Sequence, residues 1–167
     1  MPQLILFSLI TGFAQAGEKL ALGYVNLRAV IVESKTGKQN RAQIEKLVKD
    51  KQAVLVKEEK SLQALDQAFQ KDQLLLTDAQ KQEKQKEFQA KGEAYQKMLV
   101  EAKQSVSLKD EELTTKAVLA IKAIAAELAK ERKLSLVIEA TDTTVLYAEE
   151  GMDLTKAVLE RYDAKAK

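Results

Sequence analysis

The fold is decided by the stretch LLLTDAQ at residues 74–80, which separates two long helical runs. Thr77 and Gln80 have the spacing of a capping box, in which the Thr side chain accepts from the next turn and the Gln side chain reaches back. This pattern predicts that a helix begins near Asp78 and that the leucines before it form the tip of a helical hairpin. A hairpin of this length cannot bury its own surface as a globular domain does. It must project from a small base, pair with partner chains, or both.

The run that leads to the tip, from about Gln39 to Leu75, has no Gly or Pro and is dominated by strong helix formers. Apolar residues recur there every seven positions, at Val48, Leu55, Leu62, Phe69 and Leu76. A two-stranded coiled coil would keep a second position apolar as well, but here that position also holds charged residues, namely Lys51, Glu58 and Asp72. The stripe can therefore pair with one neighbouring helix, and its flanks mix apolar and charged side chains.

The return run extends from about Asp78 to Arg132 and is interrupted only by Gly92. Its apolar residues follow the helical period, which indicates a helix packed along its neighbour. Its distal half is sparse in apolar residues, whereas its last part is crowded with them, at Val118, Leu119, Ile121 and Ile124. We interpret the crowded end as buried on several sides in a subunit interface.

Short strand-like segments flank the hairpin on both sides. Leu20–Asn26 and Leu134–Ala140 read as strands, and Val145–Ala148 reads as a returning strand after a turn. Short helices are predicted at Leu27–Glu33, followed by a break over Ser34–Lys38, and at Leu154–Tyr162, with Asp153 as the N-cap. The predicted class is α+β, with a long helical hairpin over 39–132 on a β-rich base formed by 17–38 and 133–167. A small sheet has edges that need cover, and pairing with other copies of the chain is one solution.

The amino terminus carries an export signal. Leu4–Phe13 is an apolar run too short to span a bilayer, and Ala14-Gln15-Ala16 has the small-x-small pattern of a signal-peptidase site. We predict a signal peptide over 1–16, cleaved after Ala16, although no basic residue precedes Lys19. The alternative is a buried strand or helix of the mature protein.

The composition argues against catalysis. The chain has no His and no Cys, which removes the commonest general base and the thiolate metal ligands, and it has no Gly-rich phosphate loop. Acidic pairs such as Glu58-Glu59 are adjacent, so they point to different helix faces and read as solvated charge. A net charge of +2 does not favour nucleic acid. We therefore expect no enzyme activity, no cofactor, no metal and no nucleic-acid partner.

Five segments in this order resemble the Skp (OmpH-like) family of periplasmic chaperones. They are LGYVN at 22–26, ESKTGK at 33–38, LVI at 136–138, VLYA at 145–148 and DLTKAVL at 153–159. The resemblance covers about Leu20 to Tyr162. It implies a homotrimer in which strands of three copies form a central β-barrel, with three hairpins projecting like tentacles around a cavity. Family members hold unfolded outer-membrane proteins there without ATP, which implies a periplasmic location for this chain.

The resemblance leads to two sets of candidate residues. Those expected to contact clients lie on the distal arm: Leu65, Phe69, Leu74, Leu75, Leu76, Phe88, Tyr95 and Met98. Those expected in the trimer base are Tyr24, Val25, Val118, Ile121, Ile124, Val137, Ile138, Leu146 and Tyr147. For each arm residue, packing within the hairpin is the competing interpretation.

The distal arm is less basic than is common in this family, because residues 67–91 carry a net charge of only +1. Lys81, Lys84 and Lys86 form a small cluster that we interpret as a solvated helix face, compatible with at most weak contact with an anionic membrane surface. A structural or scaffolding coiled-coil protein of the cell envelope is the alternative function. It would need the same helices but no cavity for clients.

Overall fold

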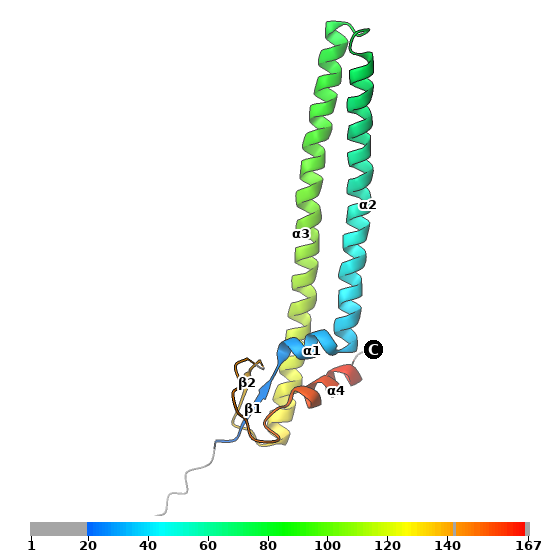
Figure 1. The fold of residues 1–167 in the computed structure, drawn as a ribbon. Helices are drawn as coiled ribbons and strands as arrows, with labels where there is room; N and C mark the ends of the chain where they lie inside the picture. The colour runs from blue at the N-terminus through cyan, green and yellow to red at the C-terminus, as the bar shows by residue number, and fades with distance from the viewer. Residues whose placement is uncertain (1–19, 142, 166–167) are drawn as a thin grey trace, which may run out of the picture.

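The structure is a computed structural model, and it describes residues 20–141 and 143–165. A two-helix arm rises from a small base in which the remaining helices and strands gather (Figure 1). The elements in chain order are β1 (Leu22–Val25), α1 (Leu27–Glu33), α2 (Lys35–Asp72), α3 (Asp78–Glu131), β2 (Leu136–Glu139) and α4 (Thr155–Lys165). The predicted signal peptide lies outside the described residues.

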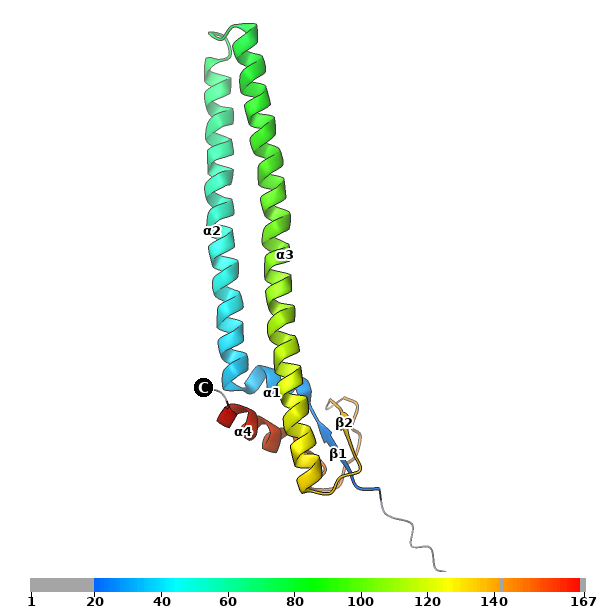
Figure 2. The same cartoon turned by 180° about the vertical axis from the view of Figure 1, so that it is seen from behind.

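The arm is the predicted hairpin of α2 and α3, which lie side by side over the whole length of α2 (Figures 1 and 2). The capping box at its tip is confirmed, since the Thr77 N–H donates to Gln80 Oε1 at 2.9 Å and the Gln80 N–H donates to Thr77 Oγ1 at 3.4 Å. At a rise of about 1.5 Å per residue, α2 is about 57 Å long and α3 about 81 Å. Because α3 is the longer helix, its last turns extend into the base.

The junction between α1 and α2 is tighter than the sequence predicted. The expected break over 34–38 is wrong, because only Ser34 lies outside the two helices. Ser34 is completely buried, and its Oγ accepts from the Gly37 N–H at 3.0 Å, which caps α2. A Cβ atom at Gly37 would lie 1.6 Å from the carbonyl oxygen of Ile31. The two helices can therefore meet this closely only because residue 37 has no side chain.

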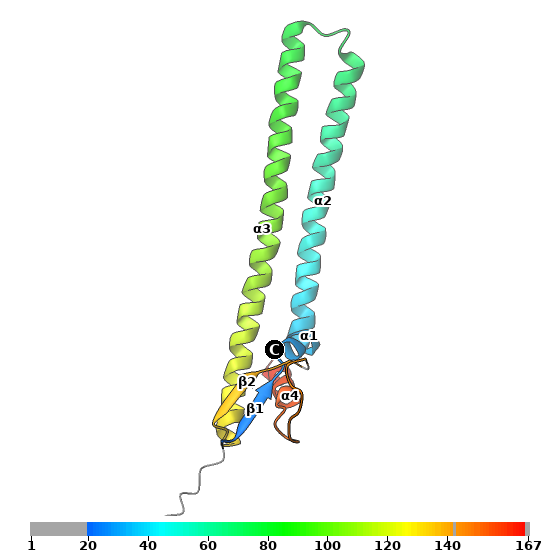
Figure 3. The same cartoon turned by 60° about the vertical axis from the view of Figure 1, so that its left-hand side comes forward.

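The sheet has two strands within the described residues, not three. β1 and β2 pair in parallel, with Leu22 opposite Leu136 and Tyr24 opposite Ile138 (Figure 3). Parallel strands need a long crossover, and here the whole helical hairpin supplies it. The predicted strand at Val145–Ala148 is wrong, and this segment pairs with neither strand.

The other edge of β1 explains why no third strand forms beside it. Tyr24 donates its N–H to the Met152 carbonyl and accepts from the Leu154 N–H, both at 2.9 Å. The chain leading into α4 thus occupies this edge. The segment at 145–148 would have to reach the free edge of β2, but the preceding turn, closed by Thr144 N–H to the Thr141 carbonyl at 2.8 Å, does not return it there.

One apolar core lies in the base, between the end of α3, α1, β1 and α4. Its fully buried members include Val30, Ile121, Ile124, Leu154 and Val158. Two ion pairs attach α4 to the last turns of α3, Arg161 to Glu131 and Lys165 to Glu127. Within residues 20–141 and 143–165, no helix combines the length and apolarity needed to cross a bilayer.

α4 also holds the root of the arm. The Asp163 carboxylate accepts from the Lys35 N–H, the first helical residue of α2, at 2.7 Å. Tyr162 is buried beside it, and this burial raises the pKa of its hydroxyl, although a hydrogen bond with Thr36 acts in the opposite direction. Because α4 contacts both helices of the arm at their base, it fixes where the arm begins.

Candidate functional site

The arm has almost no core of its own. No residue of α2 is buried, and the first buried residue of α3 is Ala102, far from the tip. A pair of helices normally buries an apolar stripe between them. Here the apolar side chains between Ala102 and the tip stay partly accessible to water, which leaves them available to a partner.

The structure separates the predicted client-contact residues into three groups. Leu74 and Leu75 protrude at the tip with 91% and 85% of their surface exposed. Tyr95 and Met98 are half-buried further down α3. The remaining four come together below the tip, in two adjoining crevices between the helices: Leu65, Phe69, Leu76 and Phe88.

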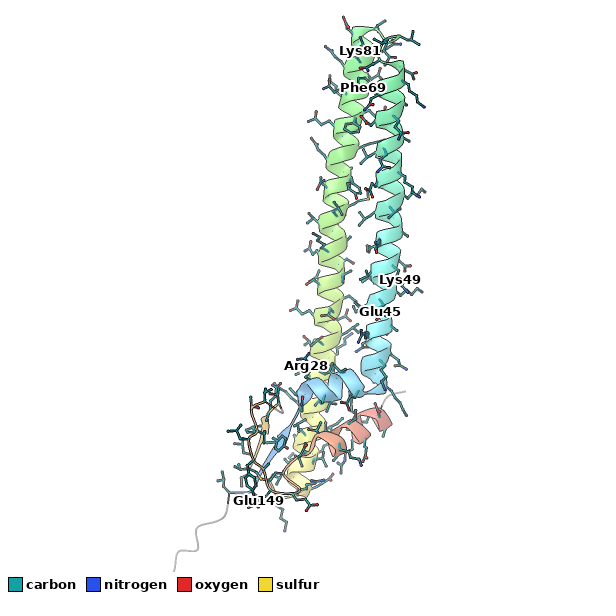
Figure 4. The ribbon with its side chains drawn as sticks, in the orientation of Figure 1. Arg28, Glu45, Lys49, Phe69, Lys81 and Glu149 are labelled. Atoms are coloured by element: carbon teal, nitrogen blue, oxygen red, sulfur yellow. The ribbon has the colours of Figure 1, made fainter. Side chains whose placement is uncertain are left out.

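We call the larger of these the distal crevice. It has a volume of about 220 Å³ and is lined by Leu65, Asp66 and Phe69 from α2 and by Lys84, Gln85 and Phe88 from α3. A smaller crevice of about 60 Å³ adjoins it toward Leu76 and shares three of these residues. Figure 4 marks Phe69 near the distal end of the hairpin. Sequence periodicity had identified the apolar members of the lining, but not the polar ones.

The predicted base residues divide by burial. Val25, Ile121 and Ile124 are at most 2% exposed, and the chain's own core accounts for their burial. Tyr24, Val118 and Val137 are half-buried. Ile138, Leu146 and Tyr147 are 51%, 97% and 85% exposed. The chain's own core therefore explains the crowding only for Ile121 and Ile124, whereas Val118 is half-buried and Leu119 is 63% exposed, which leaves both accessible to a partner.

One face of the sheet is both apolar and uncovered. Side chains alternate along a strand, so Leu22 and Tyr24 share a face with their β2 partners Leu136 and Ile138. Three of these four, Leu22, Leu136 and Ile138, are 38–51% exposed. We call this set the outer sheet face. Sequence analysis omitted Leu22 and Leu136 from the base residues, although the same alternation could have identified them.

Several charges on the arm pair along its own helices, mostly on α3. Near the tip, Lys81 lies 3.9 Å from Asp78 and Lys84 lies 3.6 Å from Glu87. Closer to the base, hydrogen bonds and charges from Lys116 and Lys109 lower the pKa of Glu112 to about 2. Glu112 is exposed and stays ionised at any physiological pH, so it has no character of a general acid. These pairs support the interpretation of the lysines as a solvated surface.

The acidic side chains of the arm do not gather into a coordination sphere. Among the residues that the structure describes, no group of three or more carboxylates is placed to hold a metal ion. The arm therefore offers a partner apolar surface and dispersed charge, part of which is paired along α3.

The architecture is therefore a long two-helix arm with few buried side chains on a small base of helices and two strands. The chain belongs to the OmpH-like outer membrane protein family, whose model matches residues 21–162. A solved structure with the same fold is described as a candidate OmpH-like outer membrane chaperone from Caulobacter crescentus CB15. It has a TM-score of 0.81 and 18% sequence identity, and the match covers 88% of this chain and 86% of the other. Curated protein sequences give no match.

Proposed function

We propose that this protein is an ATP-independent periplasmic holdase that binds unfolded outer-membrane proteins and prevents their aggregation. One observation carries the proposal: no side chain of α2 is buried, and no side chain of α3 is buried between the tip and Ala102. Apolar side chains that a stable hairpin would bury remain accessible over a length of about 57 Å. Family membership and the chaperone description of the structural neighbour support the same conclusion.

Holding by such a surface requires no energy source. Each partly exposed Leu or Phe could contribute about 1 kcal/mol, because only part of its area is left to bury. Many such contacts add up to tight binding, while each remains individually reversible. Met98 and the long Lys and Gln side chains of the arm can adapt to different client sequences, as promiscuous surfaces require.

We propose further that the base assembles three copies, the number that the family resemblance implies. The outer sheet face supports association, since an apolar sheet face and the free edge of β2 both require cover in water. Leu146 and Tyr147, which are 97% and 85% exposed on the segment between β2 and α4, add apolar surface to the same base. The arms of an assembly would then enclose a space that a single arm cannot.

The periplasmic location is part of this proposal, together with the predicted cleavage after Ala16. Its basis is the apolar run and the Ala14-Gln15-Ala16 pattern of the sequence. Mass spectrometry of the mature protein from a periplasmic extract should find an N-terminus at Gly17. Recovery of the intact chain from the cytoplasm would contradict it. Weak contact of the arm with an anionic membrane surface is a secondary proposal, limited by the paired charges near the tip.

The test of the main function is light scattering of a denatured outer-membrane barrel diluted into buffer. The full protein should suppress the scattering without ATP. A variant that lacks residues 65–88, closed by a short turn, should lose this effect while its base still assembles. Full protection by the truncated variant would place client binding elsewhere. If the full protein fails to protect the client, a scaffolding role in the envelope becomes the better account.

A further inference from the structure

We propose that the distal crevice is a subsite for a single aromatic side chain of an unfolded client. This inference rests on the holdase function proposed above and specifies which kind of client side chain one contact of the arm prefers. The other apolar contacts of the arm would accept any apolar residue. The distal crevice differs from them in shape, in lining and in the charge at its rim.

The crevice has the size of one aromatic ring. Its volume is about 220 Å³, and an apolar cavity on the order of 150 Å³ is large enough to bind benzene. Leu65 and Phe69 enclose it from α2, and Phe88 encloses it from α3. Phe88 keeps 42% of its surface exposed although it faces a neighbouring helix, so the hairpin does not fill this gap with its own side chains. Because Phe88 is exposed to water in this open crevice, a guest that covers it removes apolar surface from water and is favoured.

The lining favours an aromatic guest over an aliphatic one of similar size. Phe69 and Phe88 offer ring edges and faces from both sides, and aromatic pairs gain more than their buried area alone provides. Lys84 and Asp66 both line this crevice, and the Lys84 ammonium group, 3.6 Å from the Glu87 carboxylate, is the cation within reach of a guest. The negative face of an aromatic ring is electrostatically complementary to this ammonium group, whereas a Leu or Met side chain is not.

The tip leucines cannot supply such selection. Leu74 and Leu75 are 91% and 85% exposed, so they protrude and enclose nothing. A protruding side chain is buried only by a partner that wraps around it, whatever the chemistry of that partner. A preference for aromatic residues must therefore come from the crevice, which lies about two turns of helix away from the tip on each side.

This inference is tested with two Gly/Ser-rich peptides that are identical except that one carries phenylalanines where the other carries leucines. They are titrated into the full-length protein with labelled Leu methyl groups, and NMR follows the signals of Leu65 and Leu76 in the crevices and Leu119 in the base. The phenylalanine peptide should bind roughly five- to tenfold more tightly, with ring-current shifts at Leu65 and Leu76 only. Lys84→Gln should reduce the preference to about twofold. The matched control is Lys91→Gln, which also removes one positive charge. Lys91 lies 3.8 Å from the same Glu87 carboxylate but does not line the crevice.

The outcomes separate this inference from the proposed function. Equal binding of the two peptides, or equal loss of preference in both lysine variants, overturns the aromatic subsite and leaves the holdase function intact. Shifts at Leu119 that match those at Leu65 also overturn it, because they place the guest elsewhere. If neither peptide binds and the denatured barrel still aggregates, the holdase proposal itself fails.

Discussion

Replacing Ile138 by Asp should abolish assembly while leaving the fold of the chain intact. Ile138 lies in β2 and is 51% exposed, and its β1 partner in the register is Tyr24. If the outer sheet face is covered by another copy, the new carboxylate is buried without a partner only in the assembly. In the isolated chain the same carboxylate reaches water.

The expected magnitudes differ strongly between folding and assembly. Full burial of an Ile side chain is worth about 1.5–3 kcal/mol, so a half-exposed one loses about 1 kcal/mol on replacement. An unpaired carboxylate excluded from water costs several kcal/mol. Since each 1.4 kcal/mol is about tenfold in affinity, association should weaken by at least a hundredfold. Ile121→Asp is different, because Ile121 is completely buried in the core of the single chain and its replacement should unfold the base.

Sedimentation velocity over a range of concentrations, with circular dichroism and urea unfolding, measures both effects. The wild type should sediment as an oligomer and Ile138→Asp as a folded monomer. Val54→Asp is the matched control, since Val54 is 52% exposed but lies on the arm, and it should leave assembly unchanged. An unchanged oligomer in Ile138→Asp, or a monomeric wild type, would refute the reasoning about the outer sheet face.

Three further outcomes are expected. Gly37→Ala should destabilise the base by about 1–3 kcal/mol or more in urea unfolding, because its Cβ would meet the Ile31 carbonyl oxygen at 1.6 Å; a neutral effect would mean that the α1–α2 junction is not rigid. Phe69→Ser alone should weaken client protection only slightly in light scattering, and complete loss would show that holding depends on one site. The Arg161 guanidinium lowers the pKa of the Glu131 carboxyl. This ion pair therefore stabilises the fold fully at pH values above the ordinary pKa of a carboxyl group, and its contribution is lost as the pH falls through the lowered pKa of Glu131. Acid unfolding of Arg161→Gln should therefore depend less on pH than that of the wild type.

The candidate client surface was only partly predictable. The seven-residue repeat placed Phe69 on the face of α2 that lines the distal crevice, and the helical period of the return run did the same for Phe88. Leu76, the last member of the repeat, lies beyond the end of α2 and lines only the smaller crevice. Periodicity gives the face of one helix, but it does not give the separation of two helices. For this reason it could not show that Leu65, Phe69 and Phe88 leave a crevice open while Leu74 and Leu75 protrude.

By itself, the sequence determined the elements whose causes are local. The structure confirms three of them: the capping box at Thr77, the long helix that the Gly- and Pro-free run before it predicts, and the short helix at Leu27–Glu33. Each depends on hydrogen bonds and helix propensities within a few residues. Tertiary structure alone decided the base. Whether Val145–Ala148 forms a strand depends on the path of the chain after β2, because the chain at 152–154 occupies the outer edge of β1 and the turn at 141–144 does not return the segment to the free edge of β2. Whether Ile121 faces a partner or its own core depends on where α1 and α4 pack, and these contacts join residues tens of positions apart in the chain, beyond the reach of any local pattern.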